Sequence, residues 1–206
     1  GAAYVYRLSG TNWVEEQKLI AGDSANWDFY GYSVAVSGNT IVIGAFNNDC
    51  AAGPICGSAY VYRFNGTSWV SEQKLTASDA TGGASFGVSV AVDGDTILVG
   101  AMNDNRVGCF SCGGAYVYRF NGTSWLEEQK LIAFDTDEND HFGSSVAVDG
   151  AKALVGAFHD DCAVPGRCGS AYVFRFDGNH WVEEQKLTAS DEEGFDEFGM
   201  SVALQG

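Results

Sequence analysis

The amino-acid sequence predicts an all-β fold, a β-propeller built from four-stranded antiparallel blades. The first observation behind this prediction is that the 206-residue chain repeats itself every 56 residues, without insertion or deletion. The second is that each repeat contains four short strand-like segments separated by turn signals. A unit of this size cannot bury its apolar faces alone, so several units must pack against one another, as radially repeated blades do.

The repeat organises residues 1–206 as a single domain of about 3.7 units. The sequence Gly-Ala-Ala-Tyr-Val-Tyr-Arg opens the chain and returns, with small changes, at three later positions. The units span residues 1–56, 57–112, 113–168 and, in part, 169–206. Because the chain opens at Gly1 inside a repeat and has no initiating methionine, we expect it to be part of a longer polypeptide.

Four strands are predicted in each repeat, and the copy that starts at Phe86 shows them most clearly. They span Val88–Val92, Thr96–Ala101, Ala115–Phe120 and Trp125–Leu131. The dipeptides Asp93-Gly94 and Asn121-Gly122 are typical of tight hairpin turns, and they join the first strand to the second and the third to the fourth. A polar loop with cysteines precedes the third strand, and an acidic loop follows the fourth. No stretch of the sequence has helical periodicity with caps.

Side-chain size predicts the order of these strands from the axis outward. The first strand carries small residues such as Ser89 and Ala91, which suit a crowded central axis. The fourth strand carries a tryptophan near its start in every unit, which suits the wider periphery. These residues are Trp13, Trp69, Trp125 and Trp181. We expect them to pack between blades, with sugar-stacking platforms as the alternative.

Composition argues against two classes of partner. Hydrophobic residues make up 46% of the chain, which is enough for a core. The formal net charge of −16 argues against a nucleic-acid partner, because a polyanion is bound by a basic surface. No apolar run approaches the roughly 20 residues that span a bilayer, so we expect no membrane insertion.

The six cysteines fall into three pairs, one in each complete repeat, in the loop before the third strand. The pairs are Cys50 with Cys56, Cys109 with Cys112, and Cys162 with Cys168. An even number confined to one loop is typical of local disulfides formed in an oxidising compartment. A zinc or redox site at Cys109 and Cys112 is the alternative, but zinc takes four ligands and no second Cys-x-x-Cys exists. We therefore predict three disulfides in a secreted protein.

Two short motifs return at the 56-residue step. They are Phe86-Gly87 and Phe142-Gly143, followed by Gly100-Ala101-Met102 and Gly156-Ala157-Phe158. Over the whole chain these motifs resemble the FG-GAP repeat of the integrin α-chain propeller and its relatives. Tyr30 replaces the phenylalanine in the first unit, and Phe46, Met102 and Phe158 stand where the family usually has proline. These departures place the chain in a divergent, non-integrin branch.

The resemblance implies a seven-bladed ring, of which this chain would begin at the third strand of one blade and end after the first strand of another. A closed four-blade ring and an open array joined to neighbouring chains are the alternatives. Family blades often bind Ca²⁺ through an Asp-x-Asp-x-Asp-Gly stretch between the first and second strands. The connections here are too short to surround a cation that takes six or more oxygens. They are Ser37-Gly38-Asn39, Asp93-Gly94-Asp95 and Asp149-Gly150-Ala151.

Carboxylates gather instead in the loop before each Phe-Gly motif. The candidate calcium ligands are Asp135, Asp137, Asn139, Asp140, Asp191 and Asp196. The spacing of Asp135, Asp137 and Asn139 is that of many calcium loops, although Asp140 takes the sixth position in place of glycine. The first aspartate recurs in all four units, which also suits a loop-capping role. We expect no required cofactor, and calcium is the candidate ion.

Patterns typical of catalysis are weak in this sequence. His141, His159 and His180 occupy different positions in their repeats, and none has a Ser or Cys partner at a recognisable spacing. We therefore expect no enzymatic activity.

Two hairpin turns are also N-glycosylation sequons. The side chains concerned are those of Asn65 and Asn121, each followed by Gly-Thr. They are candidate glycosylation sites if a eukaryotic secretory pathway makes the chain.

These features predict a non-enzymatic, extracellular or cell-surface β-propeller module for adhesion, recognition or protein–protein assembly. Its partner would be a protein or glycan ligand, or copies of itself, docked on loops or along a blade edge. The main alternative is a structural repeat protein that polymerises into a surface layer or an extracellular filament. A glycan-binding lectin is the third reading.

Overall fold

The computed structural model describes residues 1–161 and 166–206, and in this part of the chain all regular structure is β. The first two strands form a separate hairpin: β1 (Ala3–Ser9) and β2 (Asn12–Leu19). The other strands are β3 (Val34–Ser37), β4 (Thr40–Ala45), β5 (Ser58–Phe64), β6 (Trp69–Leu75), β7 (Phe86–Asp93), β8 (Thr96–Ala101), β9 (Gly114–Phe120), β10 (Trp125–Leu131), β11 (Ser145–Asp149), β12 (Lys152–Ala157), β13 (Ser170–Phe176) and β14 (Trp181–Leu187). No helix in the described residues is long and apolar enough to cross a membrane.

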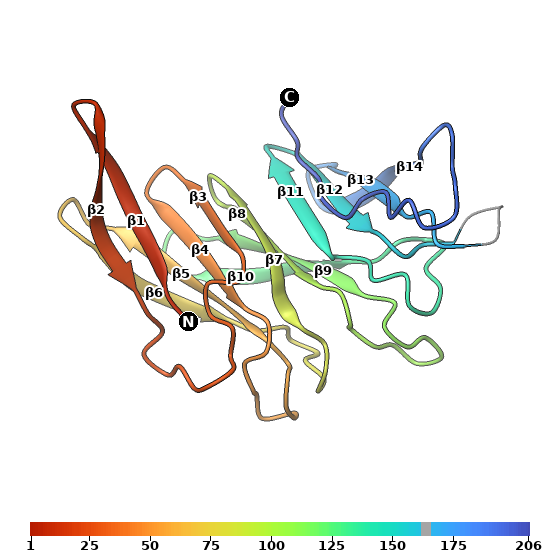
Figure 1. The fold of residues 1–206 in the computed structure, drawn as a ribbon, viewed down its shortest axis with the longest axis horizontal. Coiled ribbons are helices and arrows are strands. Elements are labelled where there is room, and N and C mark those ends of the chain that lie inside the picture. Colours follow the sequence, from red (N-terminus) through yellow and green to blue (C-terminus); the bar gives the residue numbers. More distant parts are fainter. Residues whose placement is uncertain (162–165) are drawn as a thin grey trace.

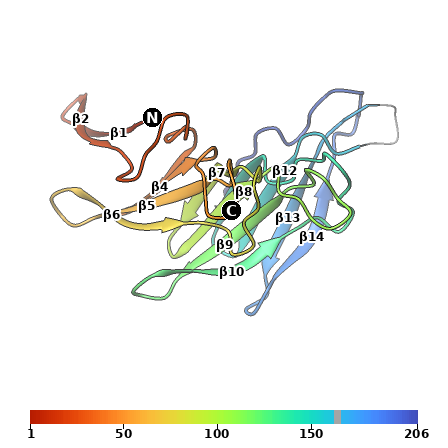
Figure 2. The same cartoon turned by 90° about the horizontal axis from the view of Figure 1, so that it is seen from below.

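The strands confirm the predicted four-stranded antiparallel blades. β3–β6, β7–β10 and β11–β14 each form one sheet in which sequential strands are neighbours, whereas β1 and β2 form a two-stranded sheet. Figure 1 shows these sheets side by side, with the β1–β2 hairpin at one end of the array and β11–β14 at the other. The array is therefore propeller-like but not closed. The view from below shows the same succession of blades (Figure 2).

The predicted strands of the repeat that starts at Phe86 match the observed ones closely. β8 and β10 have the predicted bounds, β9 begins one residue early at Gly114, and β7 extends two residues toward Phe86 and one toward Asp93. Gly94 adopts a φ of 53°, as the tight turn after β7 requires. The turn residues therefore predicted the strands well, because a tight turn fixes where one strand ends and the next begins.

The hydrophobic core lies between the blades. Val61 and Leu75 of one blade pack against Tyr116, Tyr118 and Trp125 of the next, and all five are buried. Equivalent clusters form at the other two junctions. The prediction that the tryptophans pack between blades is confirmed for those in β6, β10 and β14. Each blade thus depends on its neighbours for burial, as expected of a repeat array.

Near the axis, the first strand of one blade lies against the backbone of the next. Ser89 Oγ in β7 donates a hydrogen bond to the carbonyl oxygen of Gly143 at 2.8 Å, just before β11 begins. Gly100 of β8 faces the same place, and a Cβ added there would overlap both the Gly143 carbonyl and Ser89 Oγ. Small residues are therefore required at the axis, as the sequence predicted.

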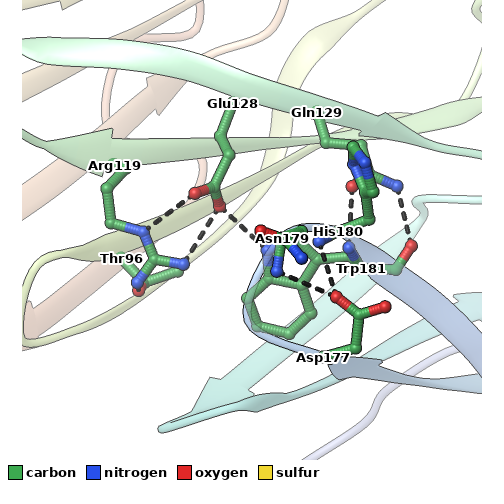
Figure 3. A network of polar contacts seen from close by, with 8 residues as sticks. All are labelled: Thr96, Arg119, Glu128, Gln129, Asp177, Asn179, His180 and Trp181. Carbon is green, nitrogen blue, oxygen red and sulfur yellow. Dashed lines mark hydrogen bonds and ion pairs between the residues drawn. The ribbon is translucent and has the colours of Figure 1, made fainter.

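Farther out, a glutamine in the last strand of one sheet binds the backbone of the next tryptophan. The pairs are Gln17 with Trp69, Gln73 with Trp125 and Gln129 with Trp181. Figure 3 shows the third pair, in which the Gln129 amide donates to the Trp181 carbonyl and accepts from its N–H, both at 2.7 Å. Glu128, held by Arg119, also accepts from the Trp181 indole at 3.0 Å. The junction is therefore bonded through both side chains and backbone.

Two of the predicted disulfides are present in the described residues. One joins Cys50 to Cys56 and the other joins Cys109 to Cys112. The prediction for Cys162 and Cys168 involves Cys162, which lies outside the described residues. Each loop bonded in this way joins the second strand of a blade to its third strand.

We predict that Gly100→Ala destabilises the protein by about 2 kcal/mol or more, because the new methyl group must displace the Gly143 carbonyl. Gly22→Ala is the control, since nothing lies within 4 Å of a Cβ there. Urea unfolding of both variants measures the difference. Equal stability of the two variants would contradict the close approach of the blades.

Candidate functional site

The first candidate calcium ligand, Asp135, is occupied by a contact between blades. Its Oδ1 accepts a hydrogen bond from the Tyr172 hydroxyl at 3.0 Å, and its Oδ2 pairs with Lys186 Nζ at 2.7 Å. Lys186 also pairs with the buried Asp160 at 2.6 Å. The same carboxylate–tyrosine–lysine contact recurs at the other two junctions. It joins Asp23 to Tyr60 and Lys74, and Asp79 to Tyr116 and Lys130.

This contact favours the charged form of Asp79 and Asp23. Burial acts to raise the pKa of Asp79, but the hydrogen bonds from Lys130 and Tyr116 outweigh it and bring the pKa below its ordinary value. The pKa of Asp23 is lowered in the same way by Lys74 and Tyr60. The recurring aspartate is therefore a bridge between blades, where the sequence predicted a loop cap or a metal ligand.

The remaining candidate calcium ligands lie in the loops but face backbone groups. Asp140 Oδ2 accepts the N–H of Asp137, and Asp196 Oδ2 accepts that of Glu193 at 2.8 Å. Asn139 adopts a φ of 65°, a conformation that asparagine tolerates better than most residues. These bonds cap the loops, whereas the sequence suggested a loop-capping role for the first aspartate of each loop.

The structure does not gather the candidate ligands around one point. The described residues contain no group of three or more His, Cys, Asp or Glu side chains that could hold a metal ion. Asp191 forms no hydrogen bond with other described residues. Calcium binding by Asp135, Asp137, Asn139, Asp140, Asp191 and Asp196 stays a prediction.

The two sequon asparagines lie at exposed hairpin tips. Asn65 Oδ1 accepts the N–H groups of Thr67 and Ser68, both at 3.0 Å. Asn121 makes the equivalent bonds to Thr123 and Ser124. Asp177 replaces these asparagines in the last unit and makes the same pair of bonds (Figure 3). Turn formation thus accounts for the asparagines, and glycosylation at Asn65 and Asn121 stays a prediction.

The most distinctive surface of the molecule is the outer face of the β1–β2 hairpin. Tyr4, Tyr6 and Trp13 are 50%, 52% and 69% exposed. Their counterparts in the three complete blades are between 0% and 7% exposed. These counterparts are Tyr60, Tyr62, Trp69, Tyr116, Tyr118, Trp125, Tyr172, Phe174 and Trp181. We call the surface formed by Tyr4, Tyr6, Leu8, Trp13 and Lys18 the open blade face.

A groove of about 770 Å³ runs along the free edge of β1. In the described residues β1 pairs with β2 alone, whereas the matching strand β5 pairs with β4 on its other edge. Val34 and Val36 of β3 line the groove and are 60% and 67% exposed, whereas the equivalent Val90 and Val92 are 8% and 9% exposed. The groove therefore lies where a second strand of the first blade would pack.

A second exposed surface is an aromatic cluster in the loops of the first unit. Phe46 stacks on Phe29 with ring centroids 5.2 Å apart and meets Tyr32 edge-on at 4.6 Å. Trp27 lies 6.5 Å from Phe29 and is one of the most exposed side chains. Sequence analysis missed this cluster, because none of its four positions carries an aromatic residue in the second unit.

Comparison with known proteins agrees with this architecture. The family described as FG-GAP repeat matches residues 13–62, 69–118, 125–174 and 181–206. No curated protein matches the sequence.

Several solved structures are similar to this chain at low sequence identity. Sqt1 of Saccharomyces cerevisiae is 9% identical with a TM-score of 0.50, covering 82% of this chain and 38% of its own. A europium-containing methanol dehydrogenase is 12% identical with a TM-score of 0.45, covering 79% of this chain and 26% of its own. The periplasmic gluconolactonase PpgL of Pseudomonas aeruginosa is 13% identical with a TM-score of 0.44, covering 92% of this chain and 65% of its own. The chain thus spans less than half the length of the first two structures.

The family match covers most of the chain and keeps the spacing of the observed blades. Each matched segment begins at the tryptophan in the last strand of a sheet, and the three complete segments end within the third strand of the following blade. This chain belongs to the FG-GAP repeat family.

Proposed function

We propose that this chain is a non-enzymatic, extracellular β-propeller module that acts by recognition or assembly. Its binding site is the free edge of β1 with the adjoining groove, and its ligand is an extended segment of a protein partner. The segment would add a strand to the hairpin, a common mode of peptide recognition.

The comparison between the groove and the complete blades carries this proposal. Where a second strand is present, it pairs with the third strand and covers the first strand of the next blade; β8, for example, pairs with β9 and contacts β11. The edge of β1 that would pair with a second strand is free in the described residues, and Val34 and Val36 of β3, which such a strand would cover, are exposed. A partner segment with the alternating, β-branched character of β4 or β8 matches this vacancy in both hydrogen bonding and shape.

The disulfides support the extracellular placement. Disulfides of this kind persist in oxidising compartments and are rare in the cytosol. Both described bonds close short loops between the second and third strands of a blade. Family membership is consistent with this placement, because the FG-GAP resemblance is to an extracellular propeller.

The surroundings of the shifted titratable groups support a non-enzymatic role. Burial raises the pKa of Asp140 to about 7, a value that suits an acid–base catalyst. This carboxyl group is only 2% exposed, however, and it accepts a bond from its own loop. The nearby His141 contacts the Met102 carbonyl, and His159 contacts Arg167. These groups are engaged with the loops, and none of them lines the groove at β1.

We expect a synthetic peptide that copies Asp95–Met102 to bind the groove, because it carries the sequence of a second strand. Fluorescence anisotropy of the labelled peptide measures the affinity. Val36→Asp is expected to weaken binding about tenfold or more by placing a charge against the apolar peptide. Val182→Asp, a change on an exposed valine of β14, should leave binding unchanged.

A second peptide separates strand addition from nonspecific adhesion. Prolines in place of Leu98 and Val99 remove backbone donors while keeping the peptide apolar. This peptide is expected to bind much more weakly. Equal binding of both peptides, or binding that ignores Val36→Asp, would contradict the proposed site.

The raised pKa of Asp140 predicts a specific dependence of stability on pH. The folded protein keeps this proton up to about pH 7, whereas an unfolded aspartate loses it near pH 4, so stability falls as pH rises between these values. Asp140→Asn removes this loss and should be about 2 kcal/mol more stable than the wild type at pH 8, with little difference at pH 4. Urea unfolding at both values checks it, with the exposed Asp95→Asn as control. A pH-independent difference would refute the buried proton.

Glycan binding is a second candidate function, favoured by the exposed aromatic cluster around Trp27. If the cluster stacks on sugar rings, Trp27→Ala should abolish the signal of the wild type on a glycan array. Trp181→Phe, a change inside a blade junction, should retain it. A wild-type array without signal would remove this candidate.

A further inference from the structure

The three junctions between blades are built from one repeated set of complementary groups. The following blade supplies two tyrosine positions, a tryptophan and a lysine. The preceding blade supplies an aspartate, a glutamine, a glutamate and an apolar surface. At the middle junction, for example, Asp79 meets Lys130 at 2.6 Å while Gln73 holds the backbone of Trp125.

One end of the molecule presents the first half of this set without the second. The open blade face carries Tyr4, Tyr6, Trp13 and Lys18 at the positions of Tyr116, Tyr118, Trp125 and Lys130. Lys18 forms no ion pair with other described residues, and its ammonium group lies 5.5 Å from the Tyr4 ring centre. The open blade face is therefore the third- and fourth-strand part of such a surface, without its usual neighbour among the described residues.

The other end presents the second half without the first. Gln185 and Asp191 occupy the positions of Gln73 and Asp79, and their side chains make no hydrogen bond with other described residues. Leu187 and Val173 are half-buried, whereas the matching Leu75 and Val61 are buried completely. We call the surface formed by Val173, Glu184, Gln185, Leu187 and Asp191 the tail face.

We propose that the open blade face of one copy of this chain docks on the tail face of a second copy. The junction would repeat the observed ones, with Lys18 against Asp191 of the second copy and the Trp13 backbone against its Gln185. The two surfaces differ, so the contact is heterologous and propagates into an open filament or a closed ring. This inference rests on the proposed assembly function, and the open blade face shares most of its residues with the lining of the groove at β1.

Charge specifies the direction of this contact. Each observed junction pairs one lysine with one aspartate at 2.6–2.7 Å. A contact between two open blade faces would bring two Lys18 side chains together, and one between two tail faces would oppose their Glu184 and Asp191 carboxylates. Like charges placed together oppose both alternatives, so head-to-tail docking is favoured.

Mass measurement across a range of protein concentration tests the proposal. As concentration rises, the measured mass of the wild type should increase from the 21.9 kDa of one chain to whole multiples of that value. Lys18→Asp and Asp191→Lys should each weaken the association about tenfold or more, because each creates a like-charge pair. The double variant K18D/D191K restores an opposite-charge pair at every contact and should recover the association.

Matched variants control for net charge. Lys152→Asp and Glu138→Lys make the same charge changes at exposed side chains outside both faces, and they should assemble like the wild type. A wild type that stays a monomer overturns the proposal. So does an effect of Lys18→Asp without one of Asp191→Lys, or a double variant that fails to recover. If the monomer still binds the Asp95–Met102 peptide, the proposed function stands while this inference falls.

Discussion

Packing between blades is the constraint on which the rest of this structure depends. Each sheet has two apolar faces and only four short strands, so it cannot exclude water from itself. The junction supplies an axial contact that admits no side chain at Gly100, an apolar layer, and a polar rim in which Gln73 binds the backbone of Trp125. These contacts join residues about one repeat apart, which explains why the period of 56 residues is kept without exception.

The same constraint determines which apolar side chains are exposed at the ends of the array. Trp13 and Trp69 have the same place in the repeat, yet one is 69% exposed and the other 7%. The difference arises because nothing among the described residues packs on the first. A surface made for burial and left open favours association. The proposed strand binding at β1 and the proposed docking of a second copy are two uses of this one property, at overlapping surfaces.

The fold could be predicted from the sequence because its signals are local and repeated. The turn at Asp93-Gly94 and the strand Thr96–Ala101 were located from neighbouring residues alone. The site could be predicted only in part. The local spacing of Asp135 indicated a calcium ligand or a loop cap. Its contact with Lys186 could not be predicted, because it joins residues far apart in the sequence. The exposure of Tyr4 was also hidden, since its local sequence matches that of the buried Tyr60 and only the missing neighbour distinguishes them.

The central claim is that burial between blades, and not the stability of single sheets, holds the fold. Hydrogen exchange of the dilute, unassembled chain followed by mass spectrometry tests it most directly, because it reports the opening of each segment separately. The account predicts the fastest exchange in β1 and β2, which form a two-stranded sheet with one neighbouring blade, and the slowest in β8 and β9 at the centre. Uniform exchange across the blades, or protection of β1 and β2 equal to that of β8 and β9, would contradict it.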